Sequence, residues 1–326
     1  PAHRLMAALG VAAPRPLAVA LSTELEKCSD LLSEAFVLQS LLDLPAEQVQ
    51  DFDMLIRRAV SYVGRDTEEG RNSRAIGARL VRLGDKALHA LCDGFAEAHA
   101  GAQKYFLILF DDIYRANPSV AAEANTERKG LAPELLERAA EVVLHAIETA
   151  SKGVRMAAME SRFVCDVEIA EDTRRRLAGA VVDSVADFIF RSEIEKIETT
   201  IARLGLPAVE PLLERLSPER GKEERVRAVR LLGDWALNVK APRGQIARLQ
   251  QTVNEVLRRL QGLALEQEFP DRGELLCALG KLVSSPAASK DADEVITRTL
   301  LDAARSSAAP LIPRALEGLC YVASSR

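Results

Sequence analysis

The chain reads Arg203-Leu-Gly-Leu-Pro-Ala-Val-Glu-Pro-Leu-Leu213 and, a little further on, Arg225-Val-Arg-Ala-Val-Arg-Leu-Leu-Gly233. Apolar side chains recur three and four positions apart in both runs, which is the spacing of an amphipathic helix. In the second run, Val226, Val229 and Leu232 fall on one face that can pack on the first helix. The two runs therefore predict a helical hairpin with its apolar faces turned inward.

The second run returns twice further along the chain. Aligned on Gly233, the window 227–235 matches 274–282 at an offset of 47 and 314–322 a further 40 residues on. A helical pattern precedes each window, at 201–216, 245–261 and 294–306. A lone hairpin cannot bury its apolar face, so hairpins at this period stack on one another. Glycine at positions such as Gly280 leaves room for a neighbouring helix. The sequence therefore predicts an all-α fold, an α-solenoid of stacked hairpins over 201–326.

A longer internal sequence similarity links the two halves of the chain. Residues 80–91 align with 201–212 at an offset of 121, and both segments contain a leucine–glycine pair. Continued without a gap, the alignment places Lys104 on Arg225, Phe110 on Leu231 and Tyr114 on Trp235. We therefore expect a hairpin of the same kind near residues 78–116.

These segments resemble the HEAT repeat of bacterial proteins. The pattern LG-x-x-A-x-x-x-L fits the first helix, and V-R-x-x-A-x-x-x-L-G fits the second. The resemblance is clearest over 201–236, moderate over 78–116 and weak over 245–323. It implies a curved solenoid whose second helices line a concave face, and it implies no particular ligand. Residues 1–77 and 118–195 match only in being helical, so the N-terminal part is expected to be more irregular.

The remaining pattern suggests a division of the chain. Residues 1–117 are interpreted as an N-terminal helical region with one HEAT-like hairpin. Residues 118–131 have no strong apolar stripe and are predicted to be a linker, and residues 132–326 continue into the repeats. A long helix is expected at 21–42, and a long helical stretch with a break near Ser192 is expected at 171–204.

Charge and cysteine usage narrow the function classes. The net charge is −5 and the pI is about 5.6, which argues against a dedicated nucleic-acid binder. Residues 217–261 are the exception, with 10 basic and 5 acidic side chains. Five separated cysteines without a CxxC pair indicate reduced thiols in the cytoplasm, and no run is long enough to span a membrane. The start at Pro1 leaves open a missing initiator methionine or a longer N-terminal region.

The sequence contains no recognisable catalytic or metal motif. The four histidines do not form HExxH or HxxxH, and P-loop, GxGxxG and GxSxG motifs are absent. His89 and His145 are interpreted as ordinary helix residues. Asp111 and Asp112 follow an apolar run and are interpreted as a solvated helix end. We therefore predict no catalytic residue, no cofactor and no metal.

The basic segment provides the predicted binding site. Arg227 and Arg230 lie three positions apart and share a helix face, with Arg225 at the start of the helix. On the concave face they would suit carboxylate or phosphate groups, with Lys104 as the equivalent of Arg225. The alternative is that Arg227 forms a salt bridge between repeats and the other arginines are solvated.

Two aromatic residues complete the predicted site. Trp235 and Tyr114 occupy equivalent places and are either anchors at the groove edge or members of the core. Phe106, Phe110 and Ile113 are expected to form a buried stripe.

The favoured function is a non-enzymatic scaffold that binds a protein partner through the concave face. One alternative is a nucleic-acid-binding protein that resembles the HEAT-like alkylpurine DNA glycosylases. The other is an enzyme that resembles the phycobilin lyases, which also use HEAT-like repeats. The sequence leaves the oligomeric state open.

Overall fold

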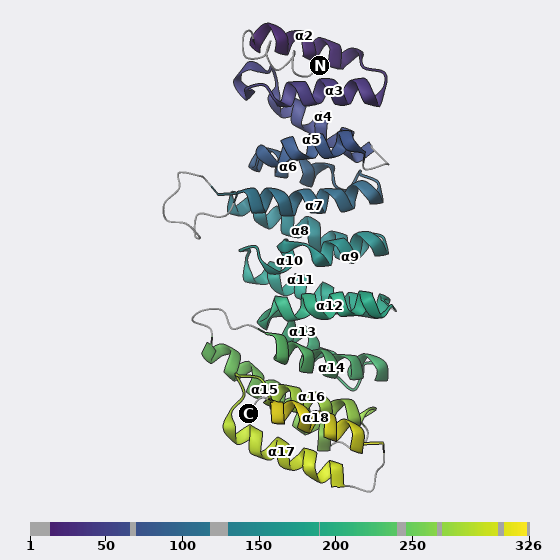
Figure 1. The fold of residues 1–326 in the computed structure, drawn as a ribbon, viewed down its shortest axis with the longest axis vertical. Helices are drawn as coiled ribbons and strands as arrows, with labels where there is room; N and C mark the ends of the chain where they lie inside the picture. The colour runs from purple at the N-terminus through teal and green to yellow at the C-terminus, as the bar shows by residue number, and fades with distance from the viewer. Residues whose placement is uncertain are drawn as a thin grey trace. The chain divides into compact units, whose positions relative to one another are not determined.

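The computed structural model describes residues 14–65, 70–117, 130–188, 190–239, 246–265, 269–305 and 310–324. All regular structure within these ranges is helical, which confirms the predicted all-α class (Figure 1). Most of the predicted linker, residues 118–129, lies outside the described residues.

The chain forms two compact units, Pro1–Thr173 and Arg174–Arg326. The first unit contains α2 (Pro14–Lys27), α3 (Leu31–Leu42), α4 (Phe52–Arg65), α5 (Arg71–Arg82), α6 (Asp85–Gly94), α7 (Ala100–Ala116), α8 (Pro133–Thr149), α9 (Lys152–Glu160) and α10 (Arg162–Cys165). The second contains most of α11 (Glu171–Ser184), then α12 (Arg191–Leu204), α13 (Val209–Glu214), α14 (Lys222–Asn238), α15 (Ile246–Leu265), α16 (Arg272–Val283), α17 (Lys290–Arg305) and α18 (Ile312–Ser324).

Alternate helices of the first unit pack into two layers. One layer follows the order α3, α5, α7, α9, and the other follows α4, α6, α8. Phe95, Phe106, Phe110 and Phe163 form a ring cluster in its core, with centroids 6.0–6.4 Å apart for the contacting pairs. The predicted buried stripe is confirmed, because Phe106, Phe110 and Ile113 are fully buried.

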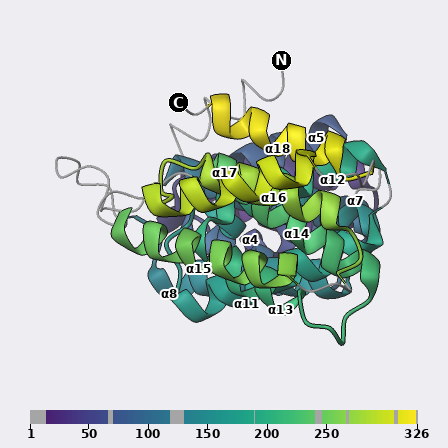
Figure 2. The ribbon, with the colours of Figure 1, turned by 90° about the horizontal axis from the view of Figure 1, so that it is seen from below.

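The second unit shows the same alternation. Helices α12, α14, α16 and α18 pack in order, and α13, α15 and α17 each pack on the helix that follows. Figure 2 shows α16, α17 and α18 lying side by side. Glycines let α14, α16 and α18 approach one another closely. A Cβ on Gly280 would lie 2.5 Å from the Gly318 backbone, and one on Gly233 would lie 3.0 Å from the Cα of Ala278.

Two expected helices are broken in the structure. The helix predicted over 21–42 divides into α2 and α3, because the Asp30 carboxylate accepts a hydrogen bond from the Ser33 N–H (2.8 Å) and starts a new helix. The helix predicted over 201–216 ends at Leu204, because Gly205 has a positive φ of 67°. The short helix α13 follows this turn.

Candidate functional site

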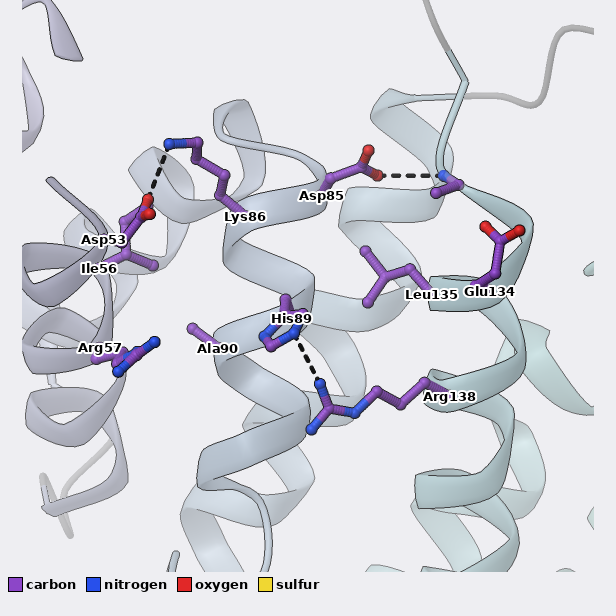
Figure 3. Close-up of a pocket in the computed structure, with 11 residues that line it drawn as sticks. Asp53, Ile56, Arg57, Asp85, Lys86, His89, Ala90, Glu134, Leu135 and Arg138 are labelled. Atoms are coloured by element: carbon purple, nitrogen blue, oxygen red, sulfur yellow. Dashed lines mark hydrogen bonds and ion pairs between the residues drawn. The ribbon is translucent and has the colours of Figure 1, made fainter. Parts of the chain in front are cut away.

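A groove of about 620 Å³ opens on the layer formed by α4, α6 and α8 (Figure 3). Its lining residues are Asp53, Ile56, Arg57, Asp85, Lys86, His89, Ala90, Ala132, Glu134, Leu135 and Arg138. The apolar members Ile56, Ala90 and Leu135 are buried and form the floor. The charged side chains and His89 form the walls, and all except the half-buried Arg138 are exposed. The site is therefore an open groove with an apolar base.

Helical spacing places these residues on one side of the layer. Asp53 and Arg57 are four positions apart on α4, and Glu134 and Arg138 have the same separation on α8. Residues with this spacing lie one above the other on a helix face. Because α6 packs between α4 and α8, the three faces combine into one surface.

Two acidic residues of the groove have partners within it. Asp53 Oδ1 lies 2.8 Å from Lys86 Nζ, which joins α4 to α6. The hydrogen bond from Lys86 holds the pKa of Asp53 below its usual value. Asp85 Oδ1 accepts a hydrogen bond from the Ala132 N–H (3.3 Å), next to the start of α8, where a negative charge is favourable.

A second set of polar contacts joins α6 to α8. Arg138 Nη1 lies 3.0 Å from His89 Nε2, and its Nη2 donates to Asp93. His89 Nδ1 lies 3.2 Å from Asp93 Oδ2. A guanidinium can only donate, so His89 Nε2 accepts the hydrogen bond from Arg138, and Nδ1 is the ring nitrogen that faces Asp93. Figure 3 shows Arg138 reaching across from α8 to this histidine.

Two titratable groups in or near the groove have shifted pKa values. An Asp53 carboxylate with a lowered pKa stays charged near neutral pH and is a weak proton carrier there. Burial raises the pKa of Cys92, also on α6, to about 12, which keeps the thiol protonated and unreactive. The groove thus presents fixed charges around an apolar floor.

The predicted site lies on other helices. Arg225 is 8% exposed, its Nε donates to the Leu216 carbonyl (3.0 Å), and its guanidinium lies 5.0 Å from the centre of the Phe269 ring. Trp235 is 1% exposed and donates from Nε1 to the Gly205 carbonyl (2.9 Å). Neither side chain is on the surface, which corrects their placement as partner contacts and confirms the core alternative for Trp235.

The other arginines of α14 differ from each other. Arg230 is exposed and lies 2.8 Å from Glu198 Oε1 on α12 and 3.8 Å from Asp234 Oδ2. The salt bridge between α14 and α12 is thus formed by Arg230, not by Arg227. Within the described part of the chain, half-buried Arg227 has no ion-pair or hydrogen-bond partner.

The predicted residues of α7 are half-buried. Lys104 lies over α9, since a Cβ on Gly153 would be 2.7 Å from its Nζ. Tyr114 donates to the Asp166 carbonyl (3.4 Å) and packs edge-on against Phe163, with ring centroids 5.9 Å apart. The six predicted residues are divided between the two units, with Lys104 and Tyr114 in the first and the residues of α14 in the second.

Asp111 also differs from its predicted place on a solvated helix end. It is half-buried and accepts hydrogen bonds from Ser161 Oγ (2.8 Å) and the Arg162 N–H (2.9 Å). Burial raises the pKa of Asp111, and the two hydrogen bonds partly oppose this.

Sequence reasoning missed the groove because its residues come from three helices that are separated in the chain by α5 and α7. The available signal was the four-residue spacing of charged residues on each helix. That spacing is common on exposed helices, and only the packing order shows that these three faces adjoin.

Two further kinds of site are absent from the described ranges. None of the helices described combines the length and apolar character required to cross a membrane. No three His, Cys, Asp or Glu side chains among the described residues are grouped as a metal site.

Comparison with known proteins gives little further information. No protein-family model and no curated protein matches the sequence. Among solved structures, the crystal structure of an engineered protein from the Northeast Structural Genomics Consortium is similar, with 14% identity and a TM-score of 0.30 over 88% of this chain and 97% of the other. At this TM-score the similarity supports neither a shared fold nor a shared function. The resemblance to HEAT repeats therefore stays a prediction.

Proposed function

We propose that this protein is a non-enzymatic, HEAT-like scaffold that binds a segment of a protein partner in the groove between α4, α6 and α8. The groove itself is the observation that supports the proposal. It combines an apolar floor with charged walls on the surface of stacked helices. Repeats of this kind expose continuous surface suited to extended partners.

The form of the groove favours a protein segment over a small ligand. Sites for small molecules bury most of the ligand in a largely apolar cavity. Here the charged wall residues are mostly exposed, so a ligand would stay partly in solvent. Protein interfaces commonly have this anatomy, with an apolar centre and a solvated polar rim.

A cytoplasmic location is part of the proposal. All five cysteines are free thiols, and Cys92 and Cys277 are buried. Unpaired thiols suit a reducing compartment.

The test is affinity capture from lysate of the source organism with three forms of the protein. Ala90→Leu fills the floor of the groove, and Arg227→Glu alters the predicted surface on α14. Circular dichroism checks that both variants keep their helical content. We expect a protein captured by the parent and by Arg227→Glu but lost in Ala90→Leu.

Other outcomes would contradict the proposal in different ways. Loss only in Arg227→Glu would place the site on α14. Recovery of nucleic acid by its absorbance at 260 nm, or of a pigment by its visible absorbance, with no enriched protein would overturn the scaffold function.

A further inference from the structure

Most charged groups in the groove already have an ion-pair or hydrogen-bond partner within the protein. Asp53 pairs with Lys86, and Asp85 accepts from the backbone at the start of α8. Arg138 is held by His89 and Asp93. These groups shape the walls, and recruiting one of them to a ligand would break an existing contact.

Two charged side chains of the groove remain available. Arg57 on α4 and Glu134 on α8 are exposed, and within the described residues neither forms a hydrogen bond or an ion pair. Arg57 is close enough to Asp53 to lower the pKa of that carboxyl, but Lys86 is the main cause of the shift. Figure 3 shows Arg57 and Glu134 on opposite sides of the groove, with Ala90 and Leu135 between them. Among the described residues, the groove thus has one available cation and one available anion at its two sides.

The spacing of the two helices that carry these charges follows from the helix packing. Because α4 packs on α6 and α6 on α8, the axes of α4 and α8 are roughly 16–20 Å apart, taking 8–10 Å for each packed pair. An extended chain rises about 3.3 Å per residue, so roughly five or six residues bridge that separation.

Charge complementarity specifies the occupant. We infer that the groove binds an extended segment of the partner in which an acidic side chain meets Arg57, a basic side chain meets Glu134, and an apolar side chain between them rests on the floor at Ala90. A wholly acidic segment would be repelled by Glu134, and a wholly basic one by Arg57. This inference rests on the proposed function, because it assumes that a protein segment fills the groove.

Peptide selection tests the inference without knowledge of the natural partner. The probe is a phage library of random peptides of about 12 residues, twice the length that the groove requires. It is selected on the parent protein and depleted on Ala90→Leu. The expected result is a set of peptides with an acidic and a basic residue about five positions apart around an apolar residue.

Charge reversal then tests each contact by fluorescence anisotropy. Arg57→Glu and Glu134→Arg should each weaken the selected peptide about tenfold at low salt, because each places like charges together. Reversing the matching charge of the peptide should restore most of the affinity. Glu148→Arg, an exposed change elsewhere on α8, is the matched control and should have no effect.

The possible failures are distinguishable. Peptides that depend on Ala90 but ignore both charge reversals would overturn this inference and leave the groove as a protein-binding site. A library that yields no peptide sensitive to Ala90→Leu would count against both the inference and the groove.

Discussion

Gly84 and Gly205 have nearly the same unusual backbone conformation, with φ and ψ of 54° and −122° at the first and 67° and −133° at the second. Each glycine follows a leucine at the end of one helix and precedes the next helical segment. Side chains other than hydrogen are strained in this conformation. The alignment of 80–91 with 201–212 therefore marks the same turn in the two units.

Gly205→Ala should lower the free energy of unfolding of the second unit by about 1–3 kcal/mol. The nearest atom to an added Cβ would be Val239 Cγ2, at 3.9 Å, so the cost comes from the backbone conformation and not from crowding. Trp235, the only tryptophan of the chain, is buried nearby and reports unfolding in urea by its fluorescence.

Gly262→Ala is the matched control for Gly205→Ala. Gly262 is exposed within α15, and an added Cβ would have no neighbour within 4 Å. Alanine there should stabilise the protein by about 0.5–1 kcal/mol, as expected in a helix interior. Equal effects of the two substitutions would contradict a strained turn at Gly205.

The sequence predicts the helical character well because apolar spacing records which face of each helix is buried. The sequence predicts the breaks between consecutive helices less well. Apolar spacing continues from α2 into α3, and the break depends on the Asp30 side chain capping the second helix. At Leu204-Gly205 the sequence held a signal for the break, since the aligned pair Leu83-Gly84 also follows a helix, α5.

The candidate site was less accessible to sequence reasoning than the fold. Helical spacing predicts that Arg227 and Arg230 share a face, but it does not identify the groups opposite that face. Arg230 meets Glu198 from α12, a residue 32 positions earlier in the chain. The groove was hard to predict from the sequence for the same reason. Arg57 and Glu134 become part of one surface only when α6 packs between their helices.

Gly280→Ala should be more destabilising than Gly233→Ala. An added Cβ on Gly280 would lie 2.5 Å from the backbone of Gly318, so α16 and α18 would have to separate. Near Gly233 the closest atom is the Cα of Ala278, at 3.0 Å, which requires a smaller shift. We expect losses of about 3 kcal/mol or more and about 1–2 kcal/mol, respectively, in urea unfolding followed by Trp235 fluorescence. The reverse order would show that the α16–α18 contact is looser than described.

Arg230→Glu and Arg227→Glu should differ although the residues are three positions apart. The first places a carboxylate against Glu198 and Asp234 and should cost about 1 kcal/mol, a modest value because the Arg230 side chain is 49% exposed. The second disturbs no ion pair in the described part of the chain and should change stability by about 0.5 kcal/mol or less. The difference in stability between the two variants should become smaller as the salt concentration rises from about 50 mM to 500 mM. A difference that did not change with salt would exclude a charge interaction as its origin.

Asp111 offers a test of a half-buried carboxylate that acts as a cap. It lies on α7 and accepts from Ser161 Oγ and the Arg162 N–H at the start of α10. Asp111→Asn keeps an oxygen acceptor for both donors but removes the buried charge. We expect stability at neutral pH to be equal to or above that of the parent. Asp111→Ala leaves both donors without this acceptor and should cost about 1–3 kcal/mol in urea unfolding.

The Asp111→Asn variant also has a pH dependence of definite sign. Burial raises the folded-state pKa of Asp111 above the ordinary value of 3.8, so protonation of this carboxyl favours the folded protein. Its contribution to stability is therefore largest below the ordinary pKa and falls as the pH rises through the folded pKa. Other carboxylates are common to both proteins and cancel in the comparison. The stability of Asp111→Asn minus that of the parent should increase from about pH 4 to pH 7, and a decrease over that interval would show that the folded-state pKa is lowered.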